Sequence, residues 1–185
     1  MMTPEPRWFL GATENTPADR RFLERLRTLA PSWGAYGITA EQSAAIPLAL
    51  PFVGVELAHL TTEYRWLWIK FLDVEEGLGF ECSWGDITYL DDTGGTDGDI
   101  PLTSPDKTTT PEAFAERASD WVAAQASRAV LREEWHGLGR STRWTFLDHG
   151  AVLDNTRTWP WRQRRTPDRV STELAVSWIQ QHQAG

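Results

Sequence analysis

Three segments of the chain repeat apolar residues at helical spacing, and each follows a Thr-Pro pair. A threonine at the N-cap accepts a hydrogen bond from the first helical turn. Proline fits the first helical position, because its missing N–H would have no partner there. The apolar residues recur every three or four positions, as one face of an amphipathic helix requires. The sequence therefore predicts helices over residues 17–30, 111–134 and 167–182.

Strands are predicted where the apolar pattern changes to a period of two. Residues 64–72 are apolar on both alternating faces, which is typical of a central strand packed on two sides. A turn at 75–77 then leads into a strand over 78–84, and a short third strand is expected at 86–90.

Aromatic residues in these strands define two expected faces. Phe80, Cys82 and Trp84 alternate along one side of their strand. Trp66 and Trp68 share a face because they are two residues apart. A hairpin that closes at the turn is expected to bring Trp84 near these two rings.

Weaker signals occupy the rest of the chain. A second hairpin is expected from residues 143–147 and 151–153, joined by a turn at 148–150. The remaining expectations are strands at 8–10 and 52–57, a helical turn at 40–45, and an irregular loop at 91–106.

The order of these elements favours one fold class. Strands cluster along the chain instead of alternating with helices, which is typical of an α+β fold with a mostly antiparallel sheet. A chain of 185 residues has the size of one domain. We therefore expect a single α+β domain over 1–185, with three helices and a sheet of about five or six strands.

The charge of the chain is concentrated in one region. The formal net charge is −8, and residues 70–99 contain nine acidic residues and one basic residue, Lys70. That region therefore carries a charge equal to that of the whole chain. A basic protein is the matching partner for such a surface, whereas nucleic acid is disfavoured because phosphates require a positive field.

Cellular location is predicted from what the sequence lacks. No apolar run reaches the length of a membrane-spanning helix, and the first residues contain no apolar signal region. Cys82 is the single cysteine, so no internal disulfide can form. These features predict a cytoplasmic protein with no membrane partner.

The leading hypothesis is a non-enzymatic protein-binding module that neutralises a basic partner through residues 70–99. A bacterial immunity protein or antitoxin is the example that fits a small acidic domain. Eleven tryptophans supply aromatic anchors of the kind that dominate interface energies. The residues expected to bind the partner are Glu75, Glu76, Asp86, Asp91, Asp92, Asp97 and Asp99.

The sequence predicts no catalytic residue, metal or cofactor. His59, Cys82, His136 and His149 lack the paired spacing of zinc ligands. The acidic loop at 91–99 departs from the EF-hand pattern. Cys82 lies in a strand pattern without a nucleophile elbow, and no phosphate-binding glycine loop is present.

Two alternatives remain open. The first is an anion or ligand site where aromatic rings adjoin guanidinium groups, formed by Trp159, Trp161, Arg162, Arg164 and Arg165. The second is an enzyme or a small-molecule or carbohydrate-binding protein with a tryptophan-lined pocket and an acidic loop. Its acid and base would come from Glu81, Asp86, Asp91 or Asp92.

Overall fold

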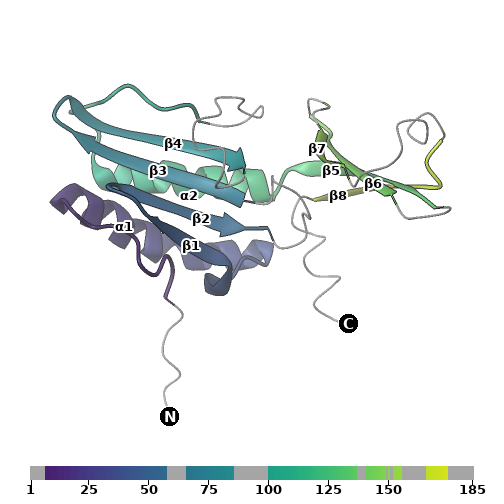
Figure 1. The fold of residues 1–185 in the computed structure, drawn as a ribbon, viewed down its shortest axis with the longest axis horizontal. Coiled ribbons are helices and arrows are strands. Elements are labelled where there is room, and N and C mark those ends of the chain that lie inside the picture. The colour runs from purple at the N-terminus through teal and green to yellow at the C-terminus, as the bar shows by residue number, and fades with distance from the viewer. Residues whose placement is uncertain are drawn as a thin grey trace, which may run out of the picture.

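The protein has two α-helices and eight strands in the part of the chain that the computed structural model describes (Figure 1). The described residues are 7–57, 66–85, 100–136, 141–148, 150, 152–155 and 166–174. The predicted α+β class is confirmed, but the strands of the described part form two four-stranded antiparallel sheets instead of one sheet.

The first helix, α1 (Pro17–Leu29), begins where the sequence predicts it. The Thr16 side chain accepts a hydrogen bond from the Asp19 N–H, and the Asp19 carboxylate accepts one from the Thr16 N–H. This reciprocal capping box satisfies two N–H groups at the start of the helix. A 3₁₀ helix, η1 (Ala30–Tyr36), continues from its end.

The second helix, α2 (Pro111–Ala126), begins at its predicted residue and ends early. The Thr110 side chain caps it by accepting from the Ala113 N–H. The predicted continuation to residue 134 is wrong, because the chain leaves the helix at Ser127 and forms strand β5 (Ala129–Trp135). Strands on both sides pair with β5, and this pairing overrides the helical preference of its Leu-Arg-Glu-Glu sequence.

The first sheet is an antiparallel meander in the order β1-β2-β3-β4. The strand bounds are β1 (Ser43–Pro47), β2 (Pro51–Glu56), β3 (Trp66–Val74) and β4 (Gly77–Gly85). The strands predicted at 52–57 and 78–84 are thereby confirmed, as is the strand predicted at 64–72 over its described residues, 66–72. The helical turn predicted at 40–45 is limited to the 3₁₀ helix η2 (Ala40–Gln42), and β1 follows it.

Both α-helices pack on one face of this sheet, as Figure 1 shows. Phe22 of α1 stacks on Phe71 of β3, with ring centroids 4.4 Å apart and planes within 8°. Phe114 of α2 packs against Phe80 of β4 at 5.1 Å. The main hydrophobic core therefore lies between the two helices and the inner face of the first sheet.

The second sheet has the order β7-β6-β5-β8. Strands β6 (Ser141–Phe146) and β7 (Val152–Asn155) form the predicted second hairpin. The predicted helix at 167–182 is wrong where the structure describes it, because β8 (Arg169–Leu174) pairs with β5. Asp168 fixes the start of β8, since its N–H donates to the Glu134 carbonyl and its carboxylate accepts from the His136 N–H at 2.5 Å.

The strand predicted at 8–10 is wrong, because Phe9 has a positive φ of 54° and the chain turns there.

No helix in the described ranges has both the length and the apolar character needed to cross a membrane.

Candidate functional site

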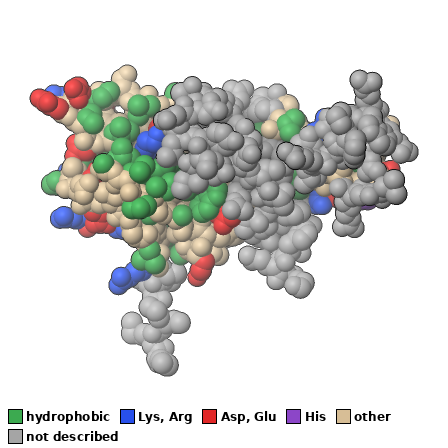
Figure 2. All heavy atoms as spheres, in the orientation of Figure 1, with side chains coloured by type: hydrophobic (Ala, Val, Ile, Leu, Met, Phe, Trp, Pro, Cys, Tyr) green, Lys and Arg blue, Asp and Glu red, His purple; other side chains and the backbone are tan. Residues whose placement is uncertain are grey.

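The turn between β3 and β4 carries exposed carboxylates. Glu75 and Glu76 form this turn, and Asp73 lies near the end of β3. All three residues are exposed, and none forms an ion pair with another described residue. Acidic side chains project at this end of the molecule in Figure 2. We call Asp73, Glu75 and Glu76 the acidic hairpin end.

A neighbouring segment fixes the backbone behind the acidic hairpin end. Leu78 and Asp106 exchange two backbone hydrogen bonds, of 3.0 and 2.8 Å. Gly77 has a φ of 139°, and a Cβ there would meet the Asp106 backbone at 2.8 Å. A glycine is therefore required at the close of the turn, for both conformation and space.

Asp106 is itself held by the threonines that follow it. Its carboxylate accepts hydrogen bonds from the Thr109 hydroxyl and from the N–H and hydroxyl of Thr108. These bonds stabilise the charged form, with Thr109 contributing most, and lower the pKa of Asp106 to about 2. These hydrogen bonds therefore tie the ionised Asp106 side chain to Thr108 and Thr109.

Asp73 of the acidic hairpin end also affects the capping acid of α1, Asp19. Burial raises the pKa of Asp19, and hydrogen bonds from Thr16 oppose this rise. The charge of Asp73 adds a smaller upward contribution to the same pKa. Asp73 is therefore close enough to α1 for like charges to interact.

One acid in the predicted binding region is neutralised within the sheet. Lys70 lies directly across from Glu81, and its Nζ is 2.8 Å from the Glu81 carboxylate. The same Nζ lies 5.6 Å from the centre of the Phe52 ring. Residues 70–85 are consequently less negative at their centre than at the turn.

Most other predicted site residues lie outside the described part of the chain. Among the expected partner-binding residues, these are Asp86, Asp91, Asp92, Asp97 and Asp99. The predicted ligand site at Trp159, Trp161, Arg162, Arg164 and Arg165 also lies outside it. The same holds for His59, for His149 and for the predicted strand at 86–90.

Aromatic side chains occupy the face of the first sheet opposite the two helices. The Trp66 and Trp68 rings stack at 4.8 Å with planes within 14°, and Phe52 packs on Trp68 at 5.0 Å. Trp68 covers Gly54, where a Cβ would lie 2.4 Å from its ring, and donates its indole N–H to the Gly85 carbonyl. Trp68 is only 5% exposed. We call Phe52, Trp66 and Trp68 the aromatic face.

The expectation that Trp84 joins this face is wrong. The hairpin register pairs Trp84 with Leu67, and Trp68 with Ser83. Side chains directly opposite each other share a face, so Trp84 points to the opposite side of the sheet from Trp66 and Trp68. There it lies in the core.

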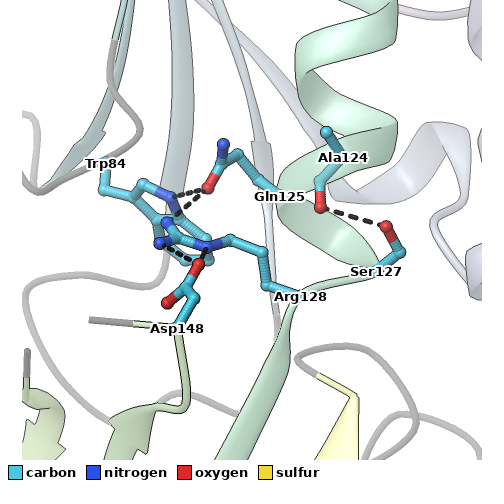
Figure 3. A network of polar contacts seen from close by, with 6 residues as sticks. All are labelled: Trp84, Ala124, Gln125, Ser127, Arg128 and Asp148. Carbon is cyan, nitrogen blue, oxygen red and sulfur yellow. Dashed lines mark hydrogen bonds and ion pairs between the residues drawn. The ribbon is translucent and has the colours of Figure 1, made fainter. Parts of the chain in front are cut away.

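Trp84 takes part in a polar network that joins the two sheets (Figure 3). Its indole N–H donates to the Gln125 side-chain oxygen at 2.9 Å, and Arg128 Nη1 donates to the same oxygen at 2.9 Å. Arg128 also binds Asp148 through Nε and Nη2, and its guanidinium lies 4.0 Å from the centre of the Phe146 ring. The Phe146 ring in turn meets Trp84 edge-on at 5.6 Å.

Sequence reasoning missed Gln125 and Arg128. The available signal was a glutamine at position 125 among the apolar residues of α2, where it is only 5% exposed. A buried polar side chain requires a partner. The helix predicted over 111–134 includes Arg128, so the position of this residue between α2 and β5 could not be predicted.

The described residues form no recognisable catalytic centre. Cys82 is fully buried, and no group of three metal-binding side chains occurs in the described ranges. His136 Nε2 is 3.3 Å from the Glu134 carboxylate, which also binds Arg132 at 2.6 Å. These three side chains form an ion-pair network at the end of β5.

Comparison with known proteins gives no assignment. No family model matches the chain, and no curated protein or solved structure is significantly similar to it.

Proposed function

We propose that the protein is a non-enzymatic binding module that recognises a basic protein through the acidic hairpin end. The observation that carries this proposal is that Asp73, Glu75 and Glu76 are exposed together without an ion-pair partner among the described residues. Charges arranged in this way steer an oppositely charged protein and accelerate its association.

The surroundings of the acidic hairpin end favour binding to a protein over mere solvation. Val74 lies between the acidic residues and is 41% exposed, so an apolar contact is available at the same place. Interfaces commonly combine an apolar centre with a charged rim. A partner presenting arginine or lysine around an apolar side chain would match this arrangement.

The hairpin is also preorganised for recognition. β3 and β4 pair along their whole length, from Trp66 opposite Gly85 to Val74 opposite Gly77, and Asp106 fixes the turn from one side. A surface that is already ordered loses less conformational entropy on binding. We include in the proposal the role of an immunity protein or antitoxin, in which such a module neutralises a basic toxin.

The first test identifies the partner. The tagged chain, incubated at low salt with a lysate of its source cells, is expected to retain one basic protein in stoichiometric amount. Mass spectrometry identifies that protein, and both proteins are then purified for binding kinetics. Reconstitution of the pair supports the proposal, whereas an acidic partner or the absence of a stoichiometric one contradicts it.

The second test compares two variants with the same change in net charge. Glu75→Gln with Glu76→Gln removes two charges from the acidic hairpin end, and Glu24→Gln with Asp120→Asn removes two from exposed positions on α1 and α2. The hairpin variant should associate about tenfold more slowly at low salt, and the difference should shrink as salt rises. Equal association rates for the two variants would show that Glu75 and Glu76 do not take part in binding.

A further inference from the structure

A cleft between the start of the chain and the end of α1 is separate from the acidic hairpin end. Its volume is about 1220 Å³. Its walls come from three parts of the sequence: the segment with Arg7, Trp8 and Leu10, the end of α1 with Arg27, and the segment with Thr39 and Glu41. Small-molecule sites are typically concave and mostly apolar, with a few polar groups that orient the ligand.

The backbone at one wall of this cleft is strained and firmly held. Phe9 has a φ of 54°, which side-chain-bearing residues seldom adopt, and its ring is completely buried. Its N–H donates to Ser43 Oγ at 3.0 Å. Arg27 donates to the carbonyls of Trp8 and Phe9, at 3.2 and 3.4 Å. Strained backbone held by surrounding contacts is a feature of binding sites, where it fixes the wall in one shape.

This conformation presents an apolar surface to the cleft. Leu10 is 67% exposed, although leucine is normally buried. Next to it, the Trp8 ring is held edge-on against Trp33 at 5.5 Å. The cleft therefore offers an apolar wall to an apolar group on a ligand.

Three charged residues line the cleft. One of them forms an ion pair, and the other two have no counter-ion among the described residues. Arg27 Nη1 lies 2.6 Å from the Glu14 carboxylate, so this cation is already paired. Arg7 and Glu41 are exposed and form no ion pair with any described residue. A hydrogen bond from the Thr39 side chain lowers the pKa of Glu41.

We propose that this cleft binds a small zwitterion with an apolar body, of the class of an apolar amino acid or a short apolar peptide. Arg7 binds the carboxylate of the ligand, Glu41 binds its ammonium group, and Trp8 and Leu10 contact its apolar side chain. Each of the two charged walls then meets an opposite charge, whereas a simple anion or cation satisfies only one of them. The inference does not depend on the proposed binding of a basic protein.

The test uses three probes that share a phenylethyl body: L-phenylalanine, 3-phenylpropionate and 2-phenylethylammonium. Isothermal titration with the full chain is expected to show saturable binding of L-phenylalanine. The two singly charged probes should bind about tenfold more weakly, because each lacks one charge-assisted contact. A fourth probe, alanylphenylalanine, separates the two sources of the zwitterion: tighter binding of the dipeptide assigns the cleft to peptides, and weaker binding assigns it to free amino acids.

Variants at the two charged walls complete the experiment. Arg7→Gln should abolish the preference for L-phenylalanine over 2-phenylethylammonium, and Glu41→Gln should abolish the preference over 3-phenylpropionate. Arg20→Gln and Glu24→Gln are matched controls on exposed positions of α1 and should leave all affinities unchanged. Unchanged melting temperatures would show that the variants are folded.

Three results would overturn the inference. They are no binding of any probe at millimolar concentration, equal affinity for the charged and zwitterionic probes, and a preference for L-phenylalanine that survives both substitutions.

Discussion

Gln125 accepts the indole N–H of Trp84 at 2.9 Å, and this bond connects the end of α2 to the inner face of the first sheet. The same oxygen accepts from Arg128, which reaches the second sheet through Asp148 and Phe146. A single amide oxygen thus serves both sheets, so its removal has consequences in each.

We expect Gln125→Leu to lower the free energy of unfolding by about 2 kcal/mol, because a buried indole N–H and a guanidinium both lose this acceptor. Chemical denaturation measures the change. Asp120→Asn, on an exposed turn of the same helix, should stay within about 0.5 kcal/mol of the wild type. If Gln125→Leu is as stable as this control, the network does not join the sheets energetically.

Gly54→Ala tests the packing of the aromatic face. The new methyl group would lie 2.4 Å from the Trp68 ring, so the ring or the strand must shift. We expect a loss of about 1–3 kcal/mol in the free energy of unfolding, as in other overpacked sites. Gly34→Ala is the matched control, since nothing lies within 4 Å of its added Cβ. Similar stabilities for the two variants would show that Trp68 is loosely held.

The pH dependence of stability should contain a contribution from Asp106. Its pKa is lowered in the folded protein to about 2, from an ordinary value of 3.8. The unfolded chain therefore takes up a proton first as pH falls, and the stability due to Asp106 is lost between about pH 4 and pH 2. Asp106→Asn cannot titrate, so its denaturation midpoint should fall less steeply over this range.

Asp120→Asn is the control for the measurement of stability at acidic pH. It removes a carboxylate from an exposed position and should leave the slope of the wild type unchanged. An Asp106→Asn profile parallel to that of the wild type would show that the threonine hydrogen bonds do not stabilise the charged form.

The two helices are also joined by ion pairs, which should contribute little. Arg21 binds Glu112 at 2.7 Å, and Arg25, one turn later, binds Glu116 at 2.6 Å. Both pairs lie at the solvent-exposed seam between α1 and α2. We expect Arg21→Gln with Arg25→Gln to leave the free energy of unfolding almost unchanged, and any loss to shrink at high salt. A larger loss that persists in salt would mean that the seam is less hydrated than its exposure suggests.

Local signals predicted where both described helices begin, since a capping threonine and a proline act within one turn. The same Thr-Pro signal at Thr166 is followed by a strand. The structure after Thr166 is determined by the pairing of β8 with β5, a contact between residues far apart in the sequence. The misplaced end of α2 has the same cause, because β5 is recruited by partners on both sides.

For the candidate site too, local features could be predicted from the sequence and long-range ones could not. The turn at Glu75 and Glu76 is predicted from its sequence and is confirmed. The position of Trp84 depends on register: a two-residue turn pairs Val74 with Gly77, which places Trp84 opposite Leu67. The cleft at Trp8 was not predicted, because it depends on the turn at Phe9 and on segments that meet only in the folded chain.

Only Ser127 and Arg128 lie between the end of α2, which packs on the first sheet, and the start of β5, a central strand of the second sheet. Because this connection is so short, it restricts the movement of the second sheet relative to α2. Any tilt of the second sheet must bend the chain at these two residues and draw the Arg128 guanidinium away from the Phe146 ring. Strain applied to one half of the molecule would therefore be transmitted to the other through this joint.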